Sequence, residues 1–257
     1  MPARIAIPQP HSANPSFVAK ALPQYCHAIE LAGGEPVVVG LDLGNEQIAR
    51  LASTCDGVLL PGSPADINPE KYGASLDPHT APGDPARDNV DELLLQDAYN
   101  MHKPVLGICF GLQSLNVWRS GTLTQHLDGA VRHSCAKSDE SALPHRVVLA
   151  PDSRLAAIVG SLRSPEKLEM TVNSSHHQAA EAVGDGLRAV AWSAEDRVIE
   201  AVEGTSPEHW VIGVQWHPER LLEDPAAVAL FRALVEAAQQ RHQHPRTATL
   251  DFESLAK

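Results

Sequence analysis

Cys109, His217 and Glu219 are the residues of this chain whose types and spacing best suit nucleophilic catalysis. A thiol becomes a strong nucleophile when a base takes its proton, and the base in turn needs a group that orients it. His217 and Glu219 stand two positions apart, and alternate residues of an extended chain point to the same side. The pattern therefore predicts a Cys-His-Glu triad in which Cys109 attacks, His217 moves the proton and Glu219 orients the imidazole.

The residues around Cys109 predict a sharp turn between a strand and a helix. An apolar run at 105–108 has the character of a buried strand, and residues 112–118 have the apolar spacing of a helix. Gly107 and Gly111 flank the cysteine, where a tight turn would crowd any side chain. This order is typical of a nucleophile elbow, with cysteine in place of serine. The helix N-terminus stabilises a thiolate, and the N–H groups of the turn can receive an oxyanion.

A second apolar run, 210–216, leads directly into His-Pro-Glu at 217–219 and predicts that the base follows a strand. Each triad residue also has a simpler interpretation: Cys109 as a buried thiol, His217 as a core histidine, Glu219 as a surface carboxylate. The strand, the helix and the distant His-Pro-Glu together favour catalysis. We expect packing or surface roles for the other cysteines, which lack such a setting: Cys26, Cys55 and Cys135.

The composition is that of a globular chain with an acidic surface. Hydrophobic residues make up 43% of the 257 residues, enough for a sizeable core, and the net charge is −12 at pH 7. That charge, without a basic patch, argues against nucleic acid and anionic membranes as partners. Residues 1–8 are too short and proline-broken for a signal peptide, and no apolar run approaches the ~20 residues of a membrane span. Widely spaced cysteines without a Cys-x-x-Cys pair favour a reducing cytoplasm.

Strand and helix patterns alternate through the first half of the chain. We predict strands at 4–8, 35–40, 56–61 and 105–108, and helices at 17–32, 45–52, 88–100 and 112–118. This alternation indicates a three-layer α/β fold with a mostly parallel central sheet. The second half adds predicted strands at 145–150, 186–192, 197–203 and 210–216, the last two as a hairpin, and a helix at 226–240. The predicted organisation is one domain, 1–241, followed by a flexible tail, 242–257.

The segment 62–87 is rich in Pro, Gly and Asp and is predicted to be an irregular loop. Ordered loops of this length usually carry function. Gly62 and Ser63 open the loop at the C-terminal edge of the predicted sheet, where the sites of α/β proteins lie. Three polar residues, Asp66, Tyr72 and Asp88, are consistent both with a pocket for a leaving group and with turn and cap roles.

These motifs together resemble the class I glutamine amidotransferase superfamily and, within it, the γ-glutamyl-γ-aminobutyrate hydrolase family, peptidase family C26. The superfamily resemblance rests on Gly107-Ile-Cys-x-Gly-x-Gln113 and Gly213-Val-Gln-Trp-His-Pro-Glu219. Four further stretches carry the closer match: Leu59-Leu-Pro-Gly-Ser-Pro-Ala-Asp66-Ile-Asn-Pro-Glu-Lys-Tyr72-Gly, Arg87-Asp88-Asn-Val-Asp-Glu92, Gly121-Thr-Leu-Thr-Gln125 and Val172-Asn-Ser-Ser-His176-His177-Gln178. The resemblance spans roughly residues 4–240 and implies the flavodoxin-like class I glutamine amidotransferase fold.

The resemblance implies a cysteine-dependent hydrolase of γ-glutamyl amide bonds that works through a thioester and needs no cofactor. It also implies an oxyanion hole made by the backbone N–H groups of Ser63 and Phe110. Both positions depart from the family, which usually has glycine at position 63 and often arginine at 110. Arg119-Ser120 is a third departure, from a pair that is commonly glycine-rich. The residues implied to bind the glutamyl end of the substrate are Gly62, Gln113, Asn173, Ser174, Ser175 and His176.

Two other functions compete with the hydrolase. A glutaminase subunit would use the same triad to deliver ammonia to a separate synthetase, but the loop 62–87 matches the hydrolases better. A non-catalytic binding protein would retain the elbow cysteine without needing the rest of the triad. We expect a small γ-glutamyl substrate, and a homodimer if the chain assembles at all. Adjacent His176 and His177 raise the question of a metal, but zinc needs three or four converging ligands, so no metal is expected.

Overall fold

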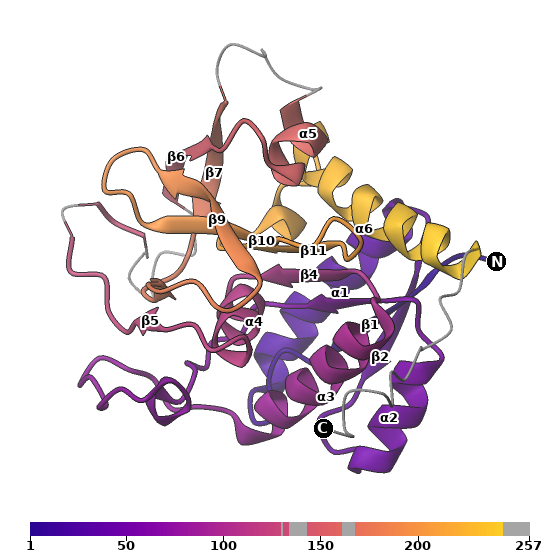
Figure 1. Ribbon diagram of the computed structural model, residues 1–257. Coiled ribbons are helices and arrows are strands. Elements are labelled where there is room, and N and C mark those ends of the chain that lie inside the picture. Colours follow the sequence, from indigo (N-terminus) through magenta and orange to yellow (C-terminus); the bar gives the residue numbers. More distant parts are fainter. Residues whose placement is uncertain (130, 134–142, 161–167, 244–257) are drawn as a thin grey trace, which may run out of the picture.

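A mixed sheet runs through the centre of the molecule, and its strand order sets the position of the candidate site (Figure 1). The computed structural model describes residues 1–129, 131–133, 143–160 and 168–243. Within these residues the sheet has nine strands in the order β2-β1-β3-β4-β11-β10-β9-β6-β7. Its first five strands are parallel: β2 (Glu35–Val39), β1 (Arg4–Pro8), β3 (Gly57–Leu60), β4 (Val105–Ile108) and β11 (Val211–Val214).

The remaining strands of the sheet are antiparallel to their neighbours: β10 (Ile199–Gly204), β9 (Leu187–Ser193), β6 (Leu143–Leu149) and β7 (Glu169–Ser174). The predicted hairpin is confirmed, because β10 and β11 pair directly. A separate two-stranded sheet joins β5 (Leu123–Thr124) to β8 (Ala179–Ala180). The parallel half therefore comes mainly from the first part of the chain, and β11 returns from the second part to complete it.

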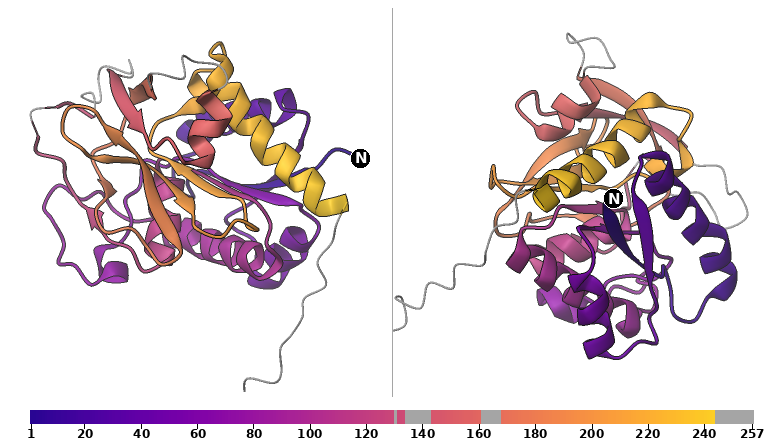
Figure 2. Two further views of the ribbon diagram at one scale, coloured as in Figure 1. Left: turned by 45° about the horizontal axis from the view of Figure 1, so that its top comes forward. Right: turned by 90° about the vertical axis from the view of Figure 1, so that its right-hand side faces the viewer.

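Helices cover both faces of the sheet and confirm the predicted three-layer α/β fold (Figure 2). One face packs against α1 (Pro15–Leu31), α5 (Arg154–Gly160) and α6 (Pro225–Gln243). The other packs against α2 (Asn45–Ser53), α3 (Pro85–Met101) and α4 (Phe110–Trp118). Two short 3-10 helices, η1 (Pro69–Tyr72) and η2 (Pro218–Arg220), lie in the connections. This arrangement leaves the ends of the central strands free to carry a site.

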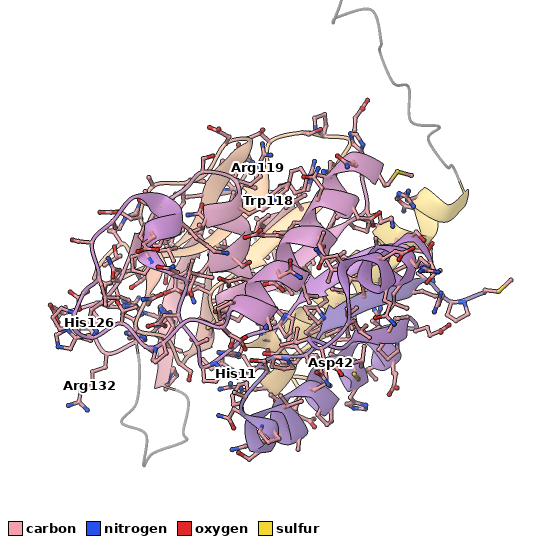
Figure 3. All side chains as sticks on the ribbon, turned by 90° about the horizontal axis from the view of Figure 1, so that it is seen from below. His11, Asp42, Trp118, Arg119, His126 and Arg132 are labelled. Carbon is pink, nitrogen blue, oxygen red and sulfur yellow. The ribbon has the colours of Figure 1, made fainter. Side chains whose placement is uncertain are left out.

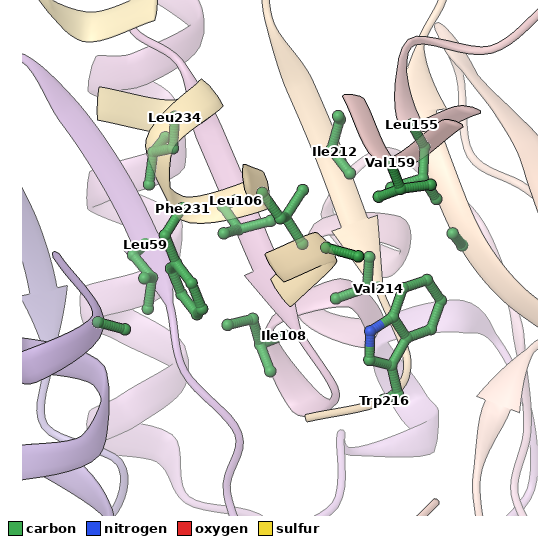
Figure 4. Packing of buried hydrophobic residues seen from close by; sticks show 14 of the residues in the cluster. Leu59, Leu106, Ile108, Leu155, Val159, Ile212, Val214, Trp216, Phe231 and Leu234 are labelled. Carbon is green, nitrogen blue, oxygen red and sulfur yellow. The ribbon is translucent and has the colours of Figure 1, made fainter. Parts of the chain in front are cut away.

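The larger core lies between the central strands and α6 (Figure 4). Leu59 of β3 and the β4 residues Leu106 and Ile108 are fully buried there, with Phe231 and Leu234 of α6. Burying an aliphatic or aromatic side chain of this size stabilises the fold by about 1.5–3 kcal/mol. This packing makes β3, β4 and β11 a rigid support for the residues that follow them.

Several elements differ from the prediction, each for a local reason. Helix α1 begins at Pro15 instead of residue 17, because Asn14 Oδ1 accepts a hydrogen bond from Phe17 N at 3.1 Å and caps it. Helix α3 begins at Pro85 instead of residue 88, because Asp84 Oδ1 accepts a hydrogen bond from Arg87 N at 3.2 Å and caps it. Helix α5 and strand β7 were not predicted, since their short sequences carry little periodicity.

The ends and covalent links of the chain are described only in part. Most of the predicted tail, 242–257, and the whole of Cys135 lie outside the described residues, so the domain limits remain a prediction. Cys26, Cys55 and Cys109 are free thiols. No helix within the described ranges combines the length and apolar character that crossing a membrane requires.

Candidate active site

Cys109 lies on a sharp turn between β4 and α4, as the sequence predicts. Its backbone has φ 52° and ψ −106°, in the half of conformational space that favours glycine. The turn is held by the hydrogen bond from Cys109 N to Val214 O, at 2.8 Å. A side chain on Gly111 would put its Cβ only 2.1 Å from Leu60 O, and one on Gly107 would meet Gly111 O at 2.6 Å. The two glycines are therefore required by the close approach of β3, β4 and α4 at this point.

His217 and Glu219 face the same site, although they follow β11 on a tight turn and not on an extended strand. Strand β11 ends at Val214, and η2 begins at Pro218 and carries Glu219. His217 Nδ1 lies 2.7 Å from Glu219 Oε1, and both residues are buried. Because Nδ1 contacts the carboxylate, Nε2 is left to act on a thiol. The two residues meet as predicted, but for a different geometric reason than the alternation of a strand.

The space around Gly62 brings the base and the nucleophile together. A Cβ on Gly62 would lie 2.9 Å from His217 Cε1 and 3.6 Å from Cys109 Cβ, so both side chains pack against the same bare backbone. Cys109 is also close enough to His217 to influence the pKa of its imidazole. The three triad residues therefore converge at the carboxyl ends of β3, β4 and β11. Cys109 is only 7% exposed, so its side chain is nearly buried at this edge of the sheet.

The charges in this site favour a protonated His217. Burial alone would lower the pKa of this imidazole, but the negative charge of Glu219 and the contact with Cys109 outweigh it and raise the pKa to about 9. Burial acts on Glu219 in the opposite sense, and His217 beside it brings the pKa of that carboxyl below its usual range. At neutral pH the site therefore holds a carboxylate and an imidazolium in direct contact.

Asn173 holds the backbone of the base in place. Its Oδ1 accepts a hydrogen bond from His217 N at 2.8 Å, and its Nδ2 donates to His217 O at 2.8 Å. Asn173 is the penultimate residue of β7 and is buried, so both bonds are shielded from water. We call this arrangement the Asn173 clasp. The resemblance implies a substrate-binding role for Asn173, and in this structure its amide oxygen and nitrogen each make one hydrogen bond to the His217 backbone.

The loop after β3 presents backbone N–H groups beside the thiol. Gly62 N donates to the hydroxyl of Tyr25, at 3.0 Å. Ser63, the next residue, does not have a positive φ, so serine causes no backbone strain at this position. Phe110 N belongs to the first turn of α4, where N–H groups have no partner within the helix. The assignment of Ser63 N and Phe110 N to an oxyanion hole stays a prediction.

The Phe110 side chain does not line the site. It is 1% exposed and packs in a small core with Ala65, Ile67, Val117 and Leu123. The guanidinium of Arg87 lies 4.9 Å from its ring centre, and Arg87 Nη2 donates to Pro61 O at 2.7 Å. Arg87 is fully buried and pairs with Asp91 at 2.7 Å. The Arg87 guanidinium is therefore a cation near position 110, and its hydrogen bond to Pro61 O holds the start of the loop after β3.

Tyr25 is a positioning residue that no local sequence pattern selects. Replacing Tyr25 with phenylalanine leaves Gly62 N–H buried without a partner, which costs about 1–3 kcal/mol. We expect the Tyr25→Phe variant to lose that much free energy of unfolding in urea and about tenfold in kcat. Tyr72→Phe is the matched control, because the buried Tyr72 hydroxyl has no hydrogen-bond partner among the described residues. Equal behaviour of the two variants would contradict this role for Tyr25.

The other residues implied to bind substrate are mostly engaged within the protein. Gln113 is buried, and its Nε2 donates to Gln178 O at 3.1 Å and approaches Gln215 Oε1 at 3.3 Å. Ser174 Oγ donates to His133 O at 2.8 Å, and His176 Nδ1 lies 2.9 Å from Gln178 O. Ser175 alone of the segment 173–176 is exposed. These contacts show a packed support behind the triad.

The long loop 62–87 is tied down by its acidic residues. Asp66 Oδ2 accepts from Ala81 N, at 2.6 Å, and Oδ1 lies 3.1 Å from His177 Nε2. Lys71 Nζ pairs with Asp88 at 2.9 Å. A groove of about 530 Å³ lies in this loop, and the triad is not among the described residues that line it. Asp66 and Asp88 therefore act as loop anchors in this structure.

Arg119 and Ser120, which replace a pair that is commonly glycine-rich in the family, form the end of α4 (Figure 3). The Arg119 guanidinium lies 5.5 Å from the Trp118 ring centre, and its Nε donates to Asp185 O at 2.7 Å. Ser120 adopts a φ of 69°, which turns the chain away from the helix. Gly121 follows because a Cβ there would meet Asn116 Nδ2 at 2.4 Å. This turn ends α4, the helix whose other end begins just after Cys109.

Comparison with known proteins agrees with this geometry. A family model described as Peptidase C26 matches residues 7–219. The chain belongs to the peptidase C26 family. It is 33% identical over 228 residues to the γ-glutamyl-γ-aminobutyrate hydrolase of Escherichia coli, covering 86% of this chain and 85% of the relative. It is 30% identical over 255 residues to a Rickettsia prowazekii protein described as glutamine amidotransferase-like, covering 84% of this chain and 88% of the relative.

The fold of this C26 protein also occurs in a solved structure. A Thermoplasma acidophilum protein described as one subunit of GMP synthase matches with a TM-score of 0.61, over 95% of this chain and 97% of the other. At 16% identity this likeness concerns the fold alone, and it confirms the class I glutamine amidotransferase architecture. The family and its relatives make this protein a hydrolase or glutamine amidotransferase-like protein.

Proposed function

We propose that this protein hydrolyses γ-glutamyl amide bonds through a thioester on Cys109. The observation that supports it is the convergence of a cysteine on a strand–helix turn with a buried His217–Glu219 pair, 2.7 Å apart. Such a set activates a thiol and carries its proton to a leaving group. The C26 family and the 33% identical hydrolase of Escherichia coli support a γ-glutamyl amide as the substrate.

The reaction follows from the charges of the site. His217 takes the proton of the Cys109 thiol, and the thiolate attacks the γ-carbonyl carbon while the N–H groups of Ser63 and Phe110 stabilise the resulting oxyanion. His217, now protonated, gives its proton to the amine nitrogen as the C–N bond breaks. A water molecule then attacks the thioester while His217 takes its proton. The C–S bond breaks, glutamate leaves, and Cys109 and His217 return to their starting state.

Rates of glutamate release by the purified chain alone test this function. The substrates are γ-glutamyl-γ-aminobutyrate, other γ-glutamyl amines and L-glutamine, and Cys109→Ala provides the background rate. We expect Cys109-dependent release with kcat/KM at least about tenfold higher for a γ-glutamyl amine than for glutamine, a difference of about 1.4 kcal/mol in transition-state binding.

Each other outcome has a definite meaning. A preference for glutamine, stimulated by a partner fraction, would replace the hydrolase with the glutaminase subunit. Release that persists in Cys109→Ala would overturn the thioester mechanism. No release from any donor would overturn the proposal and leave a non-catalytic role.

A further inference from the structure

Three buried histidines outside the triad converge on a single carboxylate oxygen. Ring nitrogens of His133, His145 and His176 lie 3.5, 3.2 and 3.5 Å from Oε1 of Glu200. Glu200 is fully buried, and none of the three histidine side chains is more than 5% exposed. The His133 ring centre is 5.0 Å from that of His145 and 4.9 Å from that of His176. We call these four residues the His3Glu cluster.

Six buried polar atoms of the His3Glu cluster have no hydrogen bond among the described residues, although three of them lie within ion-pair distance of a fourth, Glu200 Oε1. These atoms are His133 Nδ1, both ring nitrogens of His145, His176 Nε2 and both carboxylate oxygens of Glu200. A buried polar atom without a partner is rare and destabilising, and a buried carboxylate without one is more so. Such a concentration of unpartnered atoms at one point indicates that something else normally satisfies them.

The outer contacts of two histidines fix which nitrogen carries the proton. His133 Nε2 lies 2.9 Å from Asp196 Oδ2, and His176 Nδ1 lies 2.9 Å from Gln178 O. Both partners can only accept, so each of these nitrogens is an N–H donor. The lone pairs of His133 Nδ1 and His176 Nε2 therefore point at the oxygen of Glu200. Metal-bound histidines usually show this pattern, with the outer N–H held by a carboxylate or a carbonyl.

We propose that His133, His145, His176 and Glu200 form a binding site for a divalent transition metal, with Zn²⁺ as the preferred ion. Imidazole and carboxylate are zinc ligands, and four protein ligands make a closed structural site. Ligands about 2.0–2.2 Å from a tetrahedral ion are about 3.3–3.5 Å apart, because the angle between them is near 109°. The measured distances to Glu200 Oε1, 3.2–3.5 Å, match this spacing. Ligand atoms of His133, His145 and Glu200 all lie within 4.8 Å of one another. His176 is the outlying ligand, because its ring centre is 6.5 Å from that of His145.

The metal would join segments that are far apart in the chain and adjacent to the base. His145 lies on β6, Glu200 on β10, and His176 just after β7. Strand β7 carries the Asn173 clasp on His217, and Gln178 O binds both His176 and Gln113 of α4. We therefore infer a structural metal that holds the support of the triad. The inference does not depend on the substrate proposed above.

From the sequence, no further ligands could be seen to converge with His176 and His177, because the ligands of this site are distant in the chain. The four ligands span positions 133 to 200, and no two of them form a short motif. His176 and His177 are adjacent, but only His176 enters the cluster, while His177 contacts Asp66. The convergence arises from the pairing of β6 with β7 and β9, and of β9 with β10. The sequence alone does not give the strand order, so it cannot indicate this metal site.

The test measures zinc binding in the Cys109→Ala chain, so that the reactive thiol is not a ligand. We expect one Zn²⁺ per chain by elemental analysis after dialysis, and competition with a chromophoric chelator gives the affinity. Glu200→Gln and His145→Asn should each weaken binding by more than about 100-fold, since loss of an outer partner alone costs 10–100-fold. His102→Asn is the control: His102 is exposed with φ 51°, a conformation that asparagine accepts.

The spectrum of bound Co²⁺ gives a second test that needs no variant of the four proposed ligands. Co²⁺ bound to the Cys109→Ala chain should give the visible bands of a tetrahedral nitrogen and oxygen site, without an ultraviolet thiolate band. Zn²⁺ should also raise Tm in this chain and in His102→Asn, but not in Glu200→Gln. Absence of bound Zn²⁺, a thiolate–cobalt band, or equal affinity in Glu200→Gln would overturn the proposal. In that case, protons on the imidazoles of the His3Glu cluster would compensate the buried charge of Glu200.

Discussion

Replacing Glu219 with glutamine is expected to lower kcat/KM for γ-glutamyl amides by roughly 10²- to 10⁴-fold while the protein stays folded. The carboxylate lies 2.7 Å from His217 Nδ1 and fixes the tautomer that directs Nε2 toward Cys109. An amide of the same shape loses the negative charge and can present its own N–H to Nδ1. The base would then lack both its orientation and the charge that stabilises its protonated form.

The same substitution should change the pH profile in a defined direction. His217 has its pKa raised to about 9, so the wild-type protein should lose kcat/KM as pH rises through that value and the imidazolium gives up its proton. Without Glu219 burial dominates, the pKa of His217 falls, and the alkaline limb moves to lower pH. Glu223→Gln removes an exposed charge nearby and should leave the profile unchanged. An alkaline limb that stays in place in Glu219→Gln would contradict this assignment.

Replacing Arg87 with methionine should lower the free energy of unfolding by about 3–5 kcal/mol. Arg87 and Asp91 are both fully buried, and the guanidinium also donates to Pro10 O at 3.1 Å and to Pro61 O at 2.7 Å. The substitution leaves the Asp91 charge without its partner. The hydrogen bond to Pro61 O is lost as well, so the loop that presents Ser63 N should become less ordered and kcat should fall.

Urea unfolding of a small set of variants measures this effect. Arg87→Met with Asp91→Leu removes both charges and should recover much of the loss, as replacement of a buried ion pair by apolar residues often does. Arg50→Met is the matched control, because Arg50 and Glu46 form the same i,i+4 pair in solvent and should contribute less than about 1 kcal/mol. A loss for Arg87→Met no larger than for Arg50→Met would show that the buried pair has no special weight.

The pH dependence of this loss also has a fixed sign. Burial already raises the pKa of Asp91 above its usual value, and Arg87 offsets only part of that rise. In Arg87→Met the folded carboxyl therefore holds its proton to higher pH than the unfolded one. Because the folded state then binds more protons, stability falls as pH rises above the unfolded value of about 4. The Arg87→Met defect should be larger at neutral pH than in mild acid.

The sequence predicted those features that depend on neighbours in the chain. The apolar run of β4, the glycines at 107 and 111, and the helix after Cys109 are local patterns, and they define the elbow completely. The three-layer fold follows from the alternation of strands and helices in the first half. The pairing of His217 with Glu219 was predicted from an extended chain, but η2 produces it. The predicted contact between residues two positions apart was correct, but the predicted extended conformation was wrong.

The support of the site could not be predicted, because it consists of contacts between distant positions. Tyr25 reaches Gly62 over 37 residues, and Asn173 reaches His217 over 44. Neither residue has a neighbour in the sequence that marks its role. A buried asparagine or tyrosine has the same local pattern whether it holds a catalytic loop or only fills the core. The strand order decides between these alternatives, and it becomes visible only in the folded chain.

The place of β4 between β3 and β11 has a consequence for synthesis on the ribosome. Cys109 N binds Val214 O, so the turn that exposes the thiol is completed by a strand that is made about a hundred residues later. Until residues 211–214 leave the ribosome, β4 has an open edge and the cysteine has no base. Under the proposed mechanism, Cys109 therefore gains its base, His217, only after about a hundred further residues have been added.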